Sequence, residues 1–217
     1  MIKKLWIYGA GGHAVVVIDI IKKMKTFVIE GLIDDDLSKK GFKILGSEAI
    51  GDFNVFESIN EKLKIQNIFL AIGDNSSRAR LSEMLKNFSF PTIIHCDAII
   101  GDNVKIGRGT VVMPGAIIEA NVSIGEQCII NNHAVIGHGS YVGDFCHIGG
   151  GAILSGQTTI GSRTLIGIGA CITPNIKIGT KCLIGAGSVV SKAVADETFV
   201  MGKPARIISN FLRHKRA

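Results

Sequence analysis

An aliphatic residue recurs at every sixth position of the chain from Ile94 to Val190 without a single slip. All seventeen positions in this series are Ile, Val or Leu, the next residue is often glycine, and the fifth residue of each hexad is usually small. A period of six predicts a short strand and a turn, with one large and one small side chain inward and glycine where the backbone bends. Three hexads make a triangular coil, so residues 94 to about 191 are predicted to form a parallel β-helix.

The first 93 residues follow a different pattern, in which apolar runs alternate with segments of helical periodicity. Strands are predicted at 5–8, 28–33 and 67–72, and helices at 14–24 and 76–87. This alternation is typical of a small, Rossmann-like parallel α/β sheet. The sequence therefore predicts an α/β N-terminal domain over 1–93 and an all-β domain over 94–217 that ends in a short C-terminal tail.

Polar or glycine-rich residues follow each predicted strand of the first domain. Ligands of parallel α/β sheets bind at the carboxyl ends of the strands, where glycines let backbone N–H groups approach a phosphate. Acidic residues on a neighbouring strand can accept hydrogen bonds from a ribose or a base. A nucleotide is therefore the expected ligand, and the candidate residues are Gly11, Gly12, His13, Asp34, Asp35 and Gly73.

The glycine turn also allows two other interpretations. Gly9, Gly11 and Ala14, with Asp34 further along, satisfy the dinucleotide fingerprint of nicotinamide enzymes, but the domain is about half the size of the usual dinucleotide fold. The turn could equally bind no ligand, with His13 only capping the helix that follows.

Composition and charge disfavour a nucleic-acid-binding protein, a membrane protein and a protein held by disulfides or a metal. The formal charge is +6, and Arg213, Lys215 and Arg216 account for half of it, while the other basic residues are scattered without interleaved aromatic residues. This pattern disfavours nucleic acid as a partner. Neither a signal peptide nor an apolar run of membrane-span length is present, so a cytoplasmic protein without an integral membrane segment is expected. Five cysteines without a CxxC pair predict neither disulfides nor a metal site.

The hexads resemble the hexapeptide repeat, Ile-Gly-x-x-small-x, of a large class of acyltransferases. The general rule for parallel strands favours right-handed connections, but the β-helix of that class is left-handed. The resemblance therefore implies a left-handed β-helix. It also implies a homotrimer that binds acetyl-CoA in the clefts between neighbouring subunits.

Three of the six histidines, His133, His138 and His147, fall in the middle coils on turns or outward positions. Transfer of an acetyl group from a thioester to an amine or a hydroxyl needs a general base near the nucleophile, and a neutral imidazole suits that task. From the residues alone, all three are candidates, and any one of them could equally be a solvated turn residue.

The whole chain is similar to the sialic-acid O-acetyltransferase-like family, which includes the N-acetyltransferases of UDP-4-amino-sugars. The similarity rests on Ile7 to His13, Asp34-Asp35, Ala71 to Asn75, Ile136 to His147, and Gly202 to Arg206. It implies an acetyl-CoA-dependent N-acetyltransferase that acts on a UDP-linked 4-amino-sugar by direct transfer. O-acetylation of sialic acid or a related sugar is the alternative, and a noncatalytic trimeric binding subunit is a second one.

The same resemblance assigns roles to individual residues. It implies that His138 is the base and that His147, nine residues later, contacts acetyl-CoA. Backbone groups near Ile168 and Ala186 would line the pantetheine path, and Lys203 and Arg206 could meet the phosphates of coenzyme A. The UDP-sugar would be held by Gly11, Gly12, His13, Asp34, Asp35 and Gly73.

One position departs from the family pattern, which usually has Asp or Glu directly after the catalytic histidine. This chain has Gly139 there. Either Asp144 or Glu119 substitutes for the missing acid, or the acceptor differs, or His138 is not the base. Nine residues is half a coil, so His138 and His147 can serve one reaction most easily if the site lies between two subunits.

Overall fold

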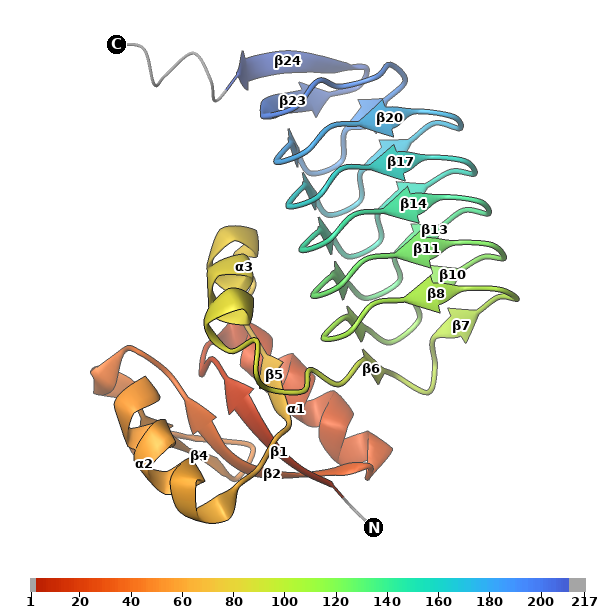
Figure 1. The fold of residues 1–217 in the computed structure, drawn as a ribbon. Helices are drawn as coiled ribbons and strands as arrows, with labels where there is room; N and C mark the ends of the chain where they lie inside the picture. Colours follow the sequence, from red (N-terminus) through yellow and green to blue (C-terminus); the bar gives the residue numbers. More distant parts are fainter. Residues whose placement is uncertain (1–2, 211–217) are drawn as a thin grey trace. The chain divides into compact units, whose positions relative to one another are not determined.

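The computed structural model describes residues 3–210, so the basic residues at 213, 215 and 216 lie outside the described part. The chain divides into two compact units, with the boundary between Ile93 and Ile94 (Figure 1).

The first unit is a five-stranded sheet with the order β3-β4-β2-β1-β5. Its strands are β1 (Lys3–Tyr8), β2 (Phe27–Ile33), β3 (Lys43–Ile44), β4 (Ser47–Gly51) and β5 (Ile68–Leu70). All pair in parallel except β3, which forms a short antiparallel hairpin with β4. Its helices are α1 (Gly12–Met24), a 3-10 turn η1 (Leu37–Lys39), α2 (Phe53–Leu63) and α3 (Asn75–Met84). The α/β class expected from the sequence is confirmed, and β3, β4 and α2 are additions to it.

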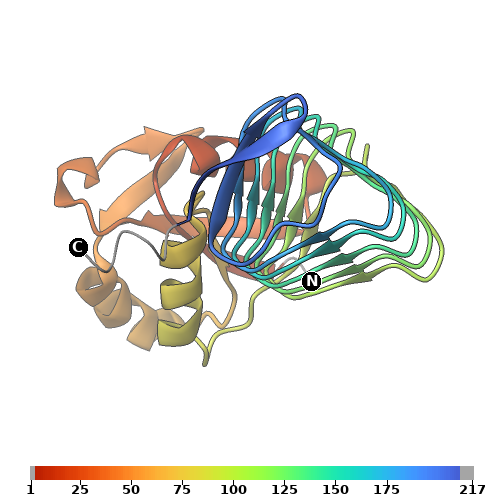
Figure 2. The same ribbon diagram turned by 90° about the horizontal axis from the view of Figure 1, so that it is seen from above.

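The core of this unit follows from the alternation of side chains along β1. Trp6 and Tyr8 share one face and pack with Phe56 of α2 and Leu81 of α3. The rings of Trp6 and Phe56 meet edge to face with centroids 5.4 Å apart. The opposite face is covered by α1, so the sheet is sandwiched between helices (Figure 2).

The second unit is a parallel β-helix of two-residue strands joined by four-residue turns. Its strands are β6 (Ile93–Ile94), β7 (Ile99–Ile100), β8 (Lys105–Ile106), β9 (Val111–Val112), β10 (Ile117–Ile118), β11 (Ser123–Ile124), β12 (Ile129–Ile130), β13 (Val135–Ile136), β14 (Tyr141–Val142), β15 (His147–Ile148), β16 (Ile153–Leu154), β17 (Thr159–Ile160), β18 (Leu165–Ile166), β19 (Cys171–Ile172), β20 (Lys177–Ile178), β21 (Leu183–Ile184) and β22 (Val189–Val190). Every predicted aliphatic position is the second residue of one of these strands, so the hexad pattern is confirmed.

Three sheets form the walls of the β-helix, and each residue pairs with the one eighteen positions later, as Ile117 does with Val135. In one column Ile130, Ile148, Ile166 and Ile184 stack inward and are fully buried. Small residues such as Ala134, Ala152 and Ala170 fill the corners beside them. Figure 2 shows the coils in superposition, with walls that stay in line from one end to the other.

Two longer strands follow the last hexad within the described residues. Strand β23 (Thr198–Gly202) pairs with β21 and continues one wall, and β24 (Ala205–Asn210) returns antiparallel to it. A hairpin therefore extends the wall beyond the last hexad. None of the helices within residues 3–210 has both the length and the apolar character needed to cross a membrane.

Candidate active site

His138 lies at an exposed corner of the β-helix, in the turn between β13 and β14. Its side chain is 66% exposed. The next residue, Gly139, has φ 65°, and the equivalent residues of the adjacent coils, Asn121 and Gln157, have φ 61° and 58°. The turn therefore needs a left-handed residue at 139, and its neighbours show that this residue need not be glycine.

A carboxylate from the preceding coil holds His138. Oε2 of Glu119 accepts the backbone N–H of His138 at 2.7 Å and lies 3.3 Å from its Nδ1. A carboxylate only accepts hydrogen bonds, so Nδ1 must carry the proton in this contact, and Nε2 keeps a lone pair that can accept a proton.

The following coil gives the imidazole room. A Cβ added to Gly156 would lie 2.4 Å from Cε1 and 2.7 Å from Nε2 of His138, so only glycine fits under the ring. Glu119, His138 and Gly156 belong to three successive coils of one corner. Glu119 therefore sets the orientation of the imidazole, and Gly156 allows the ring to lie close to the following coil.

Asp144, the other acid considered from the sequence, belongs to a different corner. It follows β14, and its Oδ1 accepts the backbone N–H of Glu126 at 2.9 Å. Its carboxylate therefore secures that turn, and of the two acids Glu119 is the one that reaches His138.

His147 lies in β15, on a different wall from the corner that carries His138. Its Nε2 is 3.1 Å from the side-chain nitrogen of Asn131, and the imidazole is half-buried. His133 takes the left-handed position of the turn after β12, with φ 55°, and its ring covers Gly115. The three histidines thus lie in three different settings, and only His138 combines a carboxylate at Nδ1 with an exposed ring.

The corner that follows β15 carries almost no side chains. Gly149, Gly150 and Gly151 form its turn, and the same corner of the next two coils contains Ile168 and Ala186, each between glycines. Ile168 is 69% exposed, and its carbonyl accepts the N–H of Gly187 at 2.8 Å. This corner therefore presents accessible backbone along three coils, with one exposed apolar side chain beside it.

In the first unit, Asp34 is already committed to neighbours within the chain. Its Oδ2 accepts the N–H of Ala10 at 2.7 Å and Nζ of Lys39 at 2.8 Å, and its Oδ1 accepts the N–H of Asp36 at 3.0 Å. Burial raises the pKa of Asp34, but the hydrogen bonds from Lys39, Ala10 and Asp36 outweigh burial and hold the pKa below its usual value. Through the bond from Ala10, Asp34 holds the glycine loop after β1 in place.

Asp35 is oriented by Tyr8, whose hydroxyl donates to its Oδ1 at 2.5 Å. Burial and this hydrogen bond raise the pKa of Tyr8 well above its usual value, so the phenol stays a donor. The sequence did not single out Tyr8, although its place at the carboxyl end of β1 could have.

The glycines of the first unit fall into two kinds. Gly9 has φ 112°, and a Cβ there would lie 2.7 Å from the carbonyl oxygen of Ala71, so the fold requires it. At Gly11, Gly12 and Gly73 an added Cβ would meet nothing within 4 Å. The fold itself does not require glycine at these three positions, which leaves the adjacent backbone open to a ligand.

Known proteins match the chain along almost its whole length. The family model described as the PglD N-terminal domain matches residues 4–85, and the one described as bacterial transferase hexapeptide (six repeats) matches 97–132 and 157–192. The crystal structure of PerB from Caulobacter crescentus, in complex with CoA and GDP-perosamine, is 33% identical with a TM-score of 0.89, and the match covers 96% of this chain and 99% of that one. The chain belongs to the PglD-like family of hexapeptide-repeat sugar acetyltransferases.

Other members of the PglD-like family agree with this assignment. The acetyltransferase domain of PglB from Neisseria gonorrhoeae, in complex with acetyl coenzyme A, is 32% identical with a TM-score of 0.87, over 95% of this chain and 99% of that one. The UDP-N-acetylbacillosamine N-acetyltransferase of Bacillus subtilis is 35% identical over 113 residues, which span about half the length of each protein (51%). The predicted family is confirmed, and with it the α/β domain followed by a left-handed parallel β-helix.

Arg78 is 1% exposed and donates to the carbonyls of Ile72 and Gly73 at 2.9 and 3.2 Å, so it shapes the third loop of the first unit. Its position inside a helical pattern gave no sign of this role.

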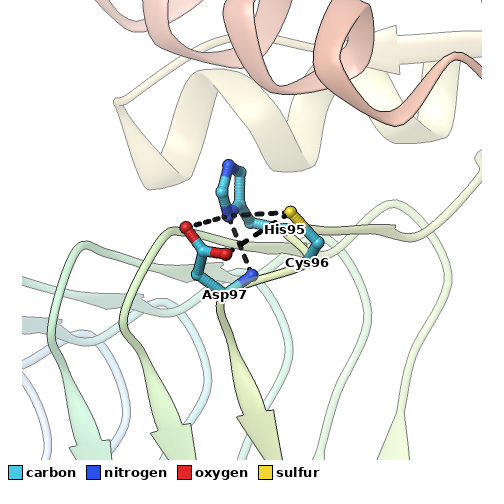
Figure 3. Close-up of side chains that lie close together, drawn as sticks. All are labelled: His95, Cys96 and Asp97. Carbon is cyan, nitrogen blue, oxygen red and sulfur yellow. Dashed lines mark hydrogen bonds and ion pairs between the residues drawn. The ribbon is translucent and has the colours of Figure 1, made fainter.

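His95, Cys96 and Asp97 gather in the turn after β6, with their side chains close together (Figure 3). Nδ1 of His95 accepts the N–H of Asp97 at 3.1 Å, so its lone pair serves the turn and is not available to a cation. The cluster is therefore a turn motif.

Proposed function

We propose that this protein transfers the acetyl group of acetyl-CoA to the amine of a nucleotide-linked 4-amino-sugar, with His138 as general base. The observation that carries the proposal is the exposed imidazole of His138, with Glu119 at its Nδ1, on a chain that matches the CoA and GDP-perosamine complex of PerB over 96% of its length. Acetyl transfer needs a general base with a correctly directed lone pair, and Nε2 of His138 would supply one.

The reaction balances without a covalent intermediate. As the amine nitrogen attacks the thioester carbonyl, Nε2 of His138 accepts the proton that the nitrogen loses. The bond between the carbonyl carbon and sulfur then breaks, and the proton leaves with the thiol of CoA. Glu119 would stabilise the imidazolium that exists between these two proton transfers.

The glycine corner after β15 is the proposed track for acetyl-CoA. Its exposed backbone near Ile168 and Ala186 would hydrogen-bond the amides of the pantetheine arm, and His147 would contact the cofactor at the acetyl end. Lys203 and Arg206, on the exposed hairpin of β23 and β24, are the proposed partners of the CoA phosphates.

The open loops of the first unit are the proposed site of the nucleotide-sugar. Gly11, Gly12 and Gly73 would let backbone amides approach the pyrophosphate, with His13 and Asp35 beside them. Asp34 would contribute by holding the glycine loop in place through the backbone N–H of Ala10. UDP is the nucleotide that we propose, and GDP is the second candidate, because the relatives include enzymes named for each.

We propose a homotrimer with the active site between neighbouring copies. The outward residues of the wall formed by β7, β10, β13, β16, β19 and β22 are all apolar, whereas those of the wall that contains β14 are mostly polar. The apolar residues are Ile99, Ile117, Val135, Ile153, Cys171 and Val189. Ile99 and Ile153 are 62% and 42% exposed, and a second copy of the chain would cover them.

The spacing of the two histidines supports the same arrangement. His138 and His147 lie half a coil apart, on a corner and on a different wall, so one site is most easily completed by His138 of one copy and His147 of the next. We place the protein in the cytoplasm, where its five unbridged cysteines would stay reduced.

An acceptor screen tests the proposed activity. The purified protein is incubated with acetyl-CoA and UDP- or GDP-linked 4-amino-sugars, together with the matching 4-hydroxy sugars, and free thiol is followed. Release with an amino-sugar and not with its hydroxyl counterpart supports N-acetylation. Release only with hydroxyl acceptors, sialic acid included, would favour the O-acetyltransferase, and no release with any acceptor would favour a noncatalytic subunit. Light scattering reports whether three copies associate.

A further inference from the structure

We infer that Glu119 is the positioning residue of His138, supplied by the preceding coil and not by the position beside the histidine. The inference rests on the proposed function of His138 as the base. Glu119 lies nineteen positions before His138, so a search of the residues next to the histidine does not find this contact.

The geometry gives Glu119 two tasks through one oxygen. The 2.7 Å bond from the backbone N–H of His138 fixes where Oε2 lies, and the 3.3 Å contact then directs the Nδ1 edge of the ring toward it. With the proton held at Nδ1, the lone pair is restricted to Nε2, on the side of the ring away from Glu119. The carboxylate thus selects the tautomer that can act as a base.

Acidic residues at other corners of the β-helix show which of the two contacts of Glu119 is purely structural. Asp144 accepts the backbone N–H of Glu126 at 2.9 Å, and Asp196 accepts that of Thr180 at 2.8 Å, without any histidine ring in these contacts. Securing a turn amide is therefore a recurrent use of acidic residues in this β-helix. The contact with an imidazole is the additional feature of Glu119.

Exposure determines where the effect of Glu119 should be measured. The side chains of His138 and Glu119 are 66% and 46% exposed, so the pair is screened by water and adds little to stability. When substrates exclude water from the site, the same pair gains strength, and its loss should slow turnover about 10- to 100-fold.

The test compares Glu119→Gln with Asp144→Asn, a matched loss of charge at a corner without histidine. Glutamine keeps an acceptor for the backbone N–H of His138 but removes the negative charge. We expect Glu119→Gln to lower kcat about 10- to 100-fold while the KM values for both substrates stay within about twofold, and Asp144→Asn to keep the wild-type kcat. Equal losses in the two variants, or an unchanged kcat in Glu119→Gln, would overturn the inference.

A rescue and a spectrum complete the experiment. Aspartate tolerates the left-handed backbone of position 139, so adding Gly139→Asp to Glu119→Ala places a carboxylate beside the ring again and should restore part of kcat. Long-range ¹H–¹⁵N NMR, with the His138 signal identified by its loss in His138→Ala, reports the tautomer without any turnover. Wild type should show the proton at Nδ1, and Glu119→Ala, which removes the acceptor oxygen, should not. An inactive wild type would refute the proposed function alone, whereas an unchanged tautomer would refute this inference.

Discussion

The glycine under His138 offers a sharp test of the site, because one methyl group there should move the imidazole of His138, the proposed base, without disturbing the fold. The change is Gly156→Ala. The equivalent residues of the same corner are His138 and Pro174 in the adjacent coils and Ala120 two coils before, which shows that the backbone at this place in the turn accepts a Cβ. At position 156 the three nearest atoms to an added Cβ all belong to the His138 ring.

The size of the effect follows from the contact distances. The new methyl carbon would lie 2.4 Å from Cε1 of His138, whereas nonbonded carbon atoms prefer about 3.5 to 4.0 Å, so the ring must retreat by about 1 Å. A displacement of that size can cost about 100-fold in rate. Stability should change by less than about 0.5 kcal/mol, since the turn is at the surface.

The assay is kcat with acetyl-CoA and the best amino-sugar acceptor, measured for Gly156→Ala, His138→Ala and the double variant. If the methyl group acts only through the imidazole, the double variant should be no slower than His138→Ala alone. Melting temperatures control for misfolding. A Gly156→Ala enzyme with wild-type kcat would refute the fixed position of the ring, and a further loss in the double variant would show that Gly156 acts through another residue.

Three further predictions concern the core, the cofactor track and the first unit. Ile166→Ala removes a fully buried side chain between Ile148 and Ile184 and should cost about 2 to 5 kcal/mol in denaturant unfolding, whereas Ile168→Ala, at a 69% exposed position, should leave stability unchanged and raise the KM for acetyl-CoA. Gly12→Ala fills open space at the start of α1, so the melting temperature should hold or rise while the KM for the nucleotide-sugar increases and the KM for acetyl-CoA does not. Asp34→Asn should melt below wild type at neutral pH. Since the pKa of Asp34 is lowered in the folded state, its stabilisation is present above its unfolded pKa of about 3.9 and is lost as the pH falls through the folded value, so the two proteins should converge below about pH 4. A difference that persists in acid would contradict this.

The β-helix could be predicted from the sequence in detail because its constraint is periodic. Each inward position must hold an aliphatic residue in every coil, so the hexads fix the register of every strand. The same period places residue 156 under residue 138, because eighteen positions make one coil. The sequence alone could therefore have placed Gly156 next to His138. It could not have shown that a side chain at position 156 would collide with the imidazole.

The first unit was less predictable because its contacts are not periodic. Residues 43–63 form β3, β4 and α2, yet β3 has only two residues and α2 buries a single side chain fully, Phe56, so the sequence pattern is weak. Asp34 shows the same limit. An acid at the end of a strand suggests a ligand contact, which stays a prediction, but the sequence pattern did not predict the bonds that Asp34 accepts from the amide of Ala10 and the amine of Lys39.

Mixing two inactive variants most directly tests the central claim, that acetyl transfer occurs at a site shared by His138 of one copy and His147 of the next. His138→Ala and His147→Ala chains with different tags are co-expressed, and trimers that carry both tags are isolated. Every mixed trimer would then hold one complete site out of three, so we expect about one third of the wild-type thiol release. Mixed trimers as inactive as their parents would contradict the shared site.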